Sequence, residues 1–160
     1  MNKLEKVMHS YEWVNEIANK TIIELKKAAD MLEEIHNDFF SKFDISNTKF
    51  NVLVILYKGP EEGMMLSEIG EQMLVTKANI TGLVDRLEKH GYVSRIPDQM
   101  DRRKIIARIT ETGRSFTEEV MEKYTRWTID IMAGLDAEEK NHLVNILRKM
   151  QQEIIKTQTI

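Results

Sequence analysis

The chain has 160 residues, a formal net charge of −3, 42% hydrophobic and 31% charged residues, and no cysteine. This composition is typical of a globular chain, and the lack of cysteine excludes disulfides, cysteine-ligated zinc and thiol chemistry. No stretch is apolar enough for a transmembrane helix, and the N-terminus lacks the apolar core of a secretory signal. We therefore expect a cytoplasmic protein that does not act at a membrane.

The first segment, from about Tyr11 to Phe43, is predicted to form one long helix. Its apolar or small positions are separated by alternating steps of four and three residues, which is a heptad pattern. These positions are Val14, Ala18, Thr21, Leu25, Ala28, Leu32, Ile35 and Phe39. A helix of ~33 residues is ~50 Å long, which is more than a small domain can cover. Part of this seam is expected to meet another chain.

Three shorter helices are predicted next. Ser46 or Asn47 can cap the first, which Gly59-Pro60 ends. Ser67 is predicted to cap a helix over 68–74, and Thr76 to cap another over 77–90 that ends at Gly91.

After these helices the sequence pattern changes from helical to strand-like. Residues 92–96 and 104–110 are short, β-branched segments, and they predict a two-stranded antiparallel hairpin. A long helix is predicted over 111–133, and Asp136 with Glu139 forms a capping box for the last helix. That helix carries a second apolar seam, made of Leu143, Ile146 or Leu147, Met150 and Ile154.

The expected fold is mainly α with a small antiparallel β-hairpin. The element order predicts a winged helix-turn-helix domain over 46–110. An N-terminal dimerisation helix over 1–45 and C-terminal helices over 111–160, which complete the dimerisation region, flank this domain.

Charge is distributed unevenly along the chain. Nine basic and five acidic residues lie between Lys77 and Arg114, so this window carries a net charge of about +4 and the remainder about −7. A basic segment within an acidic chain predicts contact with a polyanion, and the alternative is a chance fluctuation in surface composition.

The helix over 77–90 has an outer face without long apolar side chains. This face and its cap are formed by Thr76, Lys77, Ala78, Asn79, Thr81, Gly82, Asp85 and Arg86. A slim polar face suits entry into a DNA major groove ~12 Å wide. Asn79 and Thr81 can bond base edges, and Arg86 can bond phosphate. The alternative interpretation is an ordinary solvated helix surface.

Residues 66–113, "LSEIGEQMLVTKANITGLVDRLEKHGYVSRIPDQMDRRKIIARITETG", closely resemble the signature of the MarR family of bacterial transcriptional regulators. The resemblance implies a homodimer that binds a palindromic, double-stranded DNA operator and usually represses transcription. It also implies a small phenolic or other anionic effector that binds between the dimerisation helices and the winged domain. Two departures matter: Gly82 stands where members often carry Arg or Lys, and without cysteine a cysteine-based peroxide switch is impossible.

The predicted hairpin tip carries Asp101, Arg102, Arg103 and Lys104. The resemblance implies that Arg103 meets the minor groove, because family members have an Asp-x-Arg here. Asp101 is close enough in sequence to hold the Arg103 guanidinium, while Arg102 and Lys104 suit flanking phosphates. The alternative is a solvated turn.

Aromatic side chains are concentrated where the first two helices meet. An apolar cavity suited to a small aromatic acid is predicted from His36, Phe39, Phe40, Phe43, Phe50, Val54, Tyr57 and Arg86. A plain hydrophobic core between adjacent helices explains the same residues.

Two other functions fit parts of the sequence. Glu33 with His36 and Glu139 with His142 have the spacing of a di-iron bundle enzyme, but Glu139 already serves the predicted capping box. A winged helix can instead dock a protein, yet the basic window and a helix face without aromatic anchors argue against this. The ten methionines are scattered, which favours core packing over a metal site. No catalytic residue, metal or cofactor is expected, and the chain is not expected to be an enzyme.

Overall fold

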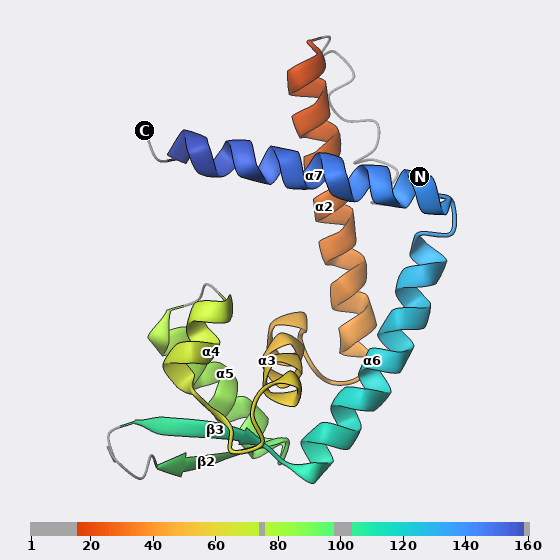
Figure 1. The fold of residues 1–160 in the computed structure, drawn as a ribbon. Coiled ribbons are helices and arrows are strands. Elements are labelled where there is room, and N and C mark those ends of the chain that lie inside the picture. Colours follow the sequence, from red (N-terminus) through yellow and green to blue (C-terminus); the bar gives the residue numbers. More distant parts are fainter. Residues whose placement is uncertain (1–15, 74–75, 98–103, 159–160) are drawn as a thin grey trace. The chain divides into compact units, whose positions relative to one another are not determined.

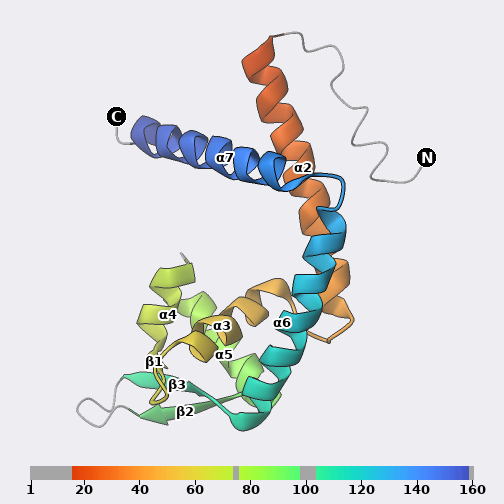
Figure 2. The ribbon, with the colours of Figure 1, turned by 45° about the vertical axis from the view of Figure 1, so that its right-hand side comes forward.

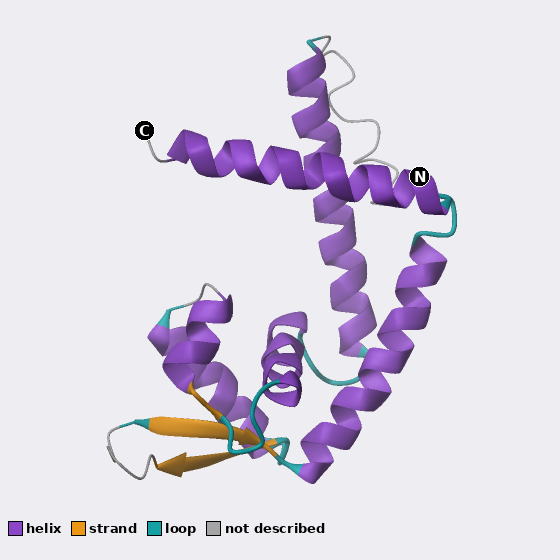
Figure 3. Ribbon diagram, viewed as in Figure 1, coloured by secondary structure: helices purple, strands orange, loops and turns teal. Residues whose placement is uncertain are grey.

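The computed structural model describes residues 16–73, 76–97 and 104–158, and it is mainly helical (Figures 1 and 3). In chain order the elements are α2 (Ile17–Ser41), α3 (Asn47–Lys58), β1 (Met64–Met65), α4 (Leu66–Met73), α5 (Lys77–Lys89), β2 (Val93–Pro97), β3 (Ile105–Ile109), α6 (Glu111–Ile131) and α7 (Ala137–Gln158). The chain divides into two compact units, residues 1–117 and 118–160, which we describe separately.

The first unit contains a three-stranded antiparallel sheet of order β1-β3-β2. The predicted hairpin is confirmed, and Val93 pairs with Ile109 at its base. The strand β1 was not predicted; it pairs Met64 with Ala107 and Met65 with Ile106. Two residues carry no readable alternation, so only the tertiary pairing reveals this strand.

The helices α3, α4 and α5 lie on one side of this sheet (Figures 1 and 2). Their inward faces form the core, in which Val52, Leu53, Ile69, Ile80 and Val84 are fully buried. Burying each such side chain contributes about 1.5–3 kcal/mol, and this packing holds α5 in place.

Two predicted helix caps are confirmed and one is wrong. The Ser46 hydroxyl accepts a hydrogen bond from the Lys49 amide at 3.3 Å, and Thr76 caps α5. Ser67 is not a cap, because α4 already begins at Leu66. The Glu68 carboxylate instead accepts a hydrogen bond from the Met65 amide at 2.9 Å, since β1 runs directly into the helix.

Gly91 ends α5 as predicted. Its φ of 76° is left-handed, a conformation that glycine adopts without steric cost. The Tyr92 amide donates to the Leu87 carbonyl and the Gly91 amide to the Glu88 carbonyl, which is the Schellman pattern. This turn directs the chain from α5 into β2.

The start of α6 is fixed to the segment that follows α5. The Thr110 hydroxyl donates to the Gly91 carbonyl at 2.7 Å and accepts from the Gly113 amide at 3.0 Å. The Tyr92 and Phe116 rings are stacked with centroids 4.4 Å apart. Gly113 therefore lies at a close approach of two backbone segments.

The helix α2 is shorter than predicted at its C-terminal end, and residues 11–15 lie outside the described part. It ends at Ser41, and Asp44 follows with a left-handed φ of 53°. At the other end the Glu16 carboxylate accepts a hydrogen bond from the Asn19 amide at 2.7 Å, and the backbone amides of Asn19 and Ala18 lower the pKa of that carboxyl.

The second unit comprises α6 from residue 118 and α7. The predicted capping box is confirmed by reciprocal 2.9 Å hydrogen bonds between Asp136 and Glu139. Glu119 and Lys123 form an exposed i,i+4 ion pair, of the kind that contributes only about 0.3–0.5 kcal/mol. None of the helices in the described part of the chain is long and apolar enough to cross a membrane.

Candidate nucleic-acid interface

The helix α5 has two chemically different faces. Its buried face carries Ile80, Leu83, Val84 and Leu87, none of them more than 6% exposed. On the other side, Ala78, Asn79 and Arg86 are exposed, and Thr81 and Gly82 are half-buried. The apolar face anchors the helix in the core, so the polar face is presented outward by a rigid element.

The N-terminus of α5 belongs to the same surface. Thr76 is exposed, and its hydroxyl accepts a hydrogen bond from the Asn79 amide at 3.4 Å. Lys77 is the first residue of the helix, and its side chain lies outside what the structure describes. The positive end of the helix dipole favours an anion such as phosphate near these residues.

Gly82 is not required by packing. A Cβ atom added at this position would meet no atom within 4 Å, whereas glycine inside a helix costs about 1 kcal/mol relative to alanine. The space above Gly82 is open, and this allows close approach of another molecule.

The hairpin supplies the second part of the candidate interface. Lys104 is exposed immediately before β3. Asp101, Arg102 and Arg103, which were predicted to contact DNA, lie outside the described residues.

Sequence reasoning missed the role of Arg95, which it counted only as one of the basic residues. The Arg95 Nη2 atom donates to the Thr81 carbonyl at 3.0 Å and forms an ion pair with Asp85. The Arg95 amide donates to the Glu88 carboxylate at 3.2 Å. A signal was present: Arg95 lies two residues after buried Val93, so both face α5, where Asp85 and Glu88 are one turn apart.

The aromatic residues predicted to line a cavity are brought together in part. Phe39 and Phe40 have ring centroids 5.1 Å apart, as do Phe40 and Phe50, and all three are at least 94% buried. Phe43 contacts Phe39 at 5.2 Å, and His36 stacks on Phe40 at 6.4 Å. These rings fill the space between α2 and α3, as a hydrophobic core does.

The remaining predicted cavity residues have different surroundings. Tyr57 packs beneath the Arg114 guanidinium, which is 5.3 Å from the ring centroid. Val54 is half-buried on α3 and Arg86 is exposed on α5. Arg114 rather than Arg86 is thus the cation that the structure places against an aromatic ring of this set.

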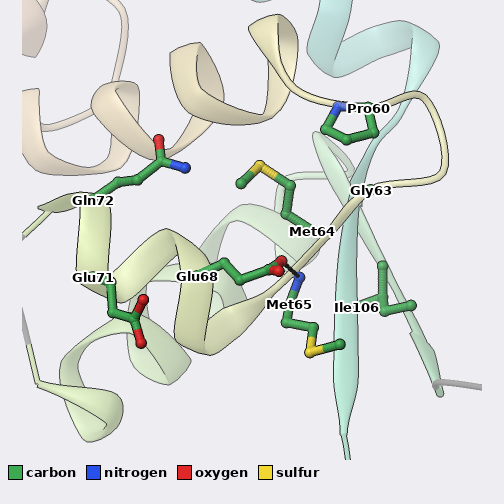
Figure 4. A pocket seen from close by; sticks show the side chains of 8 residues that line it. All are labelled: Pro60, Gly63, Met64, Met65, Glu68, Glu71, Gln72 and Ile106. Carbon is green, nitrogen blue, oxygen red and sulfur yellow. Dashed lines mark hydrogen bonds between the residues drawn. The ribbon is translucent and has the colours of Figure 1, made fainter.

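A surface groove of about 700 Å³ lies elsewhere in the first unit, between β1, α4 and Ile106 of β3 (Figure 4). Met64 and Met65 form its apolar wall, and Glu68 and Glu71 contribute carboxylates. The Glu68 carboxylate already accepts a hydrogen bond from the Met65 amide.

The residues considered for a metal centre serve other purposes. Glu139 belongs to the capping box, and the His36 Nδ1 atom lies 2.6 Å from the Leu32 carbonyl oxygen. Among residues 16–73, 76–97 and 104–158, no three His, Asp or Glu side chains are grouped so that they could hold a metal ion.

Comparison with known proteins identifies the class of fold and function. The model of the MarR family matches residues 45–105. The chain is 27% identical to the HTH-type transcriptional repressor YetL of Bacillus subtilis over 153 residues, which is 92% of each chain.

Solved structures show the same fold. The S. aureus MepR–DNA complex superposes with a TM-score of 0.72 at 20% identity, covering 81% of this chain and 94% of MepR. CouR from Rhodococcus jostii RHA1, solved with bound p-coumaroyl-CoA, superposes with a TM-score of 0.69 at 21% identity. The match covers 88% of this chain and 95% of CouR. The fold is therefore mainly helical, with a three-stranded wing sheet between N- and C-terminal helices.

Proposed function

Because the chain belongs to the MarR family of DNA-binding winged helix-turn-helix transcriptional regulators, we propose that it binds a pseudo-palindromic operator as a homodimer and represses transcription. The observation that carries this proposal is α5, which is anchored by one buried apolar face and presents a slim polar face outward. Such a helix fits a major groove, and the hairpin that follows it can reach the neighbouring minor groove.

The residues of α5 have separate roles in this proposal. Asn79 and Thr81 bond base edges, Lys77 reaches a guanine or a phosphate, and Arg86 bonds the backbone further along. Thr76 and Ala78 border the groove, and Gly82 permits close approach because no side chain occupies the space above it. The wing contributes Arg103 to the minor groove, held by Asp101, with Arg102 and Lys104 on flanking phosphates.

Dimerisation is supported by apolar side chains that a single chain leaves in solvent. On α2, Ile17, Ile22 and Leu32 are 40–73% exposed. On α7, Leu143, Val144, Ile146, Ile154 and Ile155 are 39–66% exposed. Exposed large apolar side chains in this number on two helices are compatible with a protein interface. Terminal helices that pair across a two-fold axis would bury these side chains.

Selection of bound fragments from a random DNA library tests the dimeric operator. We expect an inverted repeat with half-site centres one helical turn apart, ~34 Å, because two α5 helices related by a two-fold axis read equivalent half-sites. Analytical ultracentrifugation at micromolar concentration should show a dimer. A stable monomer, or enriched sequences without two-fold symmetry, contradicts the proposal.

We further propose that a small aromatic acid releases the operator. Support comes from the Arg114–Tyr57 pair, which places a cation against an aromatic ring, and from the likeness to CouR, whose crystal structure contains p-coumaroyl-CoA. A carboxylate would pair with the guanidinium while its ring packs on Tyr57.

A thermal-shift screen with salicylate-like acids checks this effector proposal. Binding to the folded state raises the melting temperature by mass action, and about 2.7 kcal/mol is gained when the ligand is at 100 times its Kd. Arg114→Met should abolish the shift. If no compound of this class moves the midpoint or weakens operator binding, the aromatic set is only a core.

A further inference from the structure

Arg95 connects the wing, which is the β2–β3 hairpin, to α5, the proposed recognition helix. It lies in the middle of β2, paired with Ala107 of β3. From there its side chain reaches across to α5, where it meets the Thr81 carbonyl and the Asp85 carboxylate. The Arg95 Nε atom lies 3.6 Å from a Glu88 oxygen. One side chain thus joins a strand of the wing to three successive turns of the helix proposed to read the DNA.

The surroundings of Arg95 restrict where its guanidinium can lie. The side chain is 24% exposed, whereas Asp85 and Glu88 are 45% and 44% exposed. The Nε atom is buried and has no hydrogen-bond partner among the described residues. A guanidinium held on two sides by fixed acceptors cannot also extend to a DNA phosphate, and its charge is already balanced by two carboxylates.

We infer that Arg95, together with Asp85 and Glu88, is a positioning residue that sets the angle of the wing relative to the recognition helix. The inference rests on the proposed function, since the angle matters only if helix and wing contact one DNA duplex. Both elements must then fit neighbouring grooves at once. The strand β2 is at the edge of the sheet, on the far side of β3 from β1, and it would lose conformational entropy on binding if its pairing with β3 alone held it. Fixing the hairpin to α5 beforehand removes part of that loss.

The first test exploits a difference in sign. If Arg95 were an ordinary basic residue of the interface, then Asp85→Asn would strengthen operator binding, because it removes a negative charge beside DNA. The cluster of Arg95, Asp85 and Glu88, which we call the clamp, requires the opposite. Asp85→Asn and Arg95→Met should each weaken operator binding by about tenfold, and the double variant should bind no more weakly than either single variant. Arg108→Met, which removes an exposed arginine from the adjacent strand β3, is the matched control and should change affinity much less.

The second test separates wing placement from general loss of structure. In an Arg103→Ala background, Arg95→Met should have little further effect, because the contact that it positions is already missing. If Arg95 only stabilised the fold, Arg95→Met would weaken operator binding equally in the wild-type and the Arg103→Ala backgrounds, and it would lower the melting temperature. Arg95→Lys should not restore binding, since an ammonium cannot reproduce the planar fork of the guanidinium.

The outcomes distinguish this inference from the proposed function. If Arg103→Ala weakens binding while Arg95→Met and Asp85→Asn do not, the clamp is overturned and the wing contact stands. If Arg103→Ala binds like wild type, the clamp and the wing contact are both overturned, while operator binding by α5 stands. Tighter binding by Asp85→Asn overturns the clamp in either case, even should Arg95→Met prove too unstable to measure.

Discussion

Gly113→Ala is expected to destabilise the protein by about 2–3 kcal/mol, the upper part of the range for overpacking a close contact. A Cβ atom at this position would lie only 2.0 Å from the Tyr92 carbonyl oxygen and 2.8 Å from its carbon. Both are backbone atoms, so no side chain can rotate away. The start of α6 must shift, which strains the Thr110 hydrogen bonds and the Tyr92–Phe116 stack.

Thermal or urea denaturation at fixed protein concentration measures this loss, which corresponds to a fall of roughly 4–12 °C in Tm. Gly82→Ala is the matched control. It is the same substitution within a helix, but its Cβ would meet no atom within 4 Å, so stability should rise by up to about 1 kcal/mol. Equal stabilities for the two variants would show that α6 does not approach Tyr92 as closely as described.

The elements that sequence predicted best are those with local signals. The caps at Ser46, Thr76 and Asp136 each rest on a side chain that bonds an amide three residues away, so a four-residue window contains the whole interaction. Gly91 was found for the same reason, because a left-handed residue after a helix favours glycine wherever it occurs.

What sequence missed depends on residues far apart along the chain. The strand β1 exists because Met64 and Met65 meet Ala107 and Ile106 more than 40 residues later. Ser67 has the composition of a cap, but the sheet pairing that precedes it moved the helix start to Leu66. Arg95 was assigned to the DNA-facing charge because its partners on α5 become visible only once β2 is packed against that helix.

The candidate interface shows the same division. The polar face of α5 could be predicted, because the 3.6-residue period separates it from Ile80, Val84 and Leu87. The effector cavity stays a prediction, because aromatic composition does not distinguish a cavity from a core; of the residues named for it, Phe40 and Phe50 pack against each other. The net charge of the basic window was counted correctly, but counting could not show which basic side chains are engaged within the chain, as Arg95 is by Asp85 and Glu88.

Arg103→Ala is expected to weaken operator binding at least tenfold, or ~1.4 kcal/mol. Narrow A·T-rich minor grooves concentrate negative potential, and an arginine from the wing can enter one. Asp101→Ala should lose somewhat less, because it frees the guanidinium without deleting it. Fluorescence anisotropy with the selected operator at physiological salt measures both.

Several controls assign the loss to the wing. Arg126→Ala removes the same charge from α6, where Arg126 is 76% exposed and paired with Glu122. It reports the general electrostatic effect, which should be small because exposed charges are screened beyond about 8 Å at this salt. Lys77→Ala should instead change the preference among major-groove sequences.

Arg103→Ala and Asp101→Ala should both still dimerise and melt close to wild type, because the sequence predicts a charged hairpin tip at these positions and surface substitutions usually change stability little. The loss should also depend on the DNA: an operator whose flanks are changed from A·T to G·C pairs has a wider minor groove with weaker potential, so the variant and wild type should bind it more equally. If Arg103→Ala binds the A·T-flanked operator as tightly as wild type, then Asp101-Arg102-Arg103 is a solvated turn. The operator would then be recognised by α5 alone.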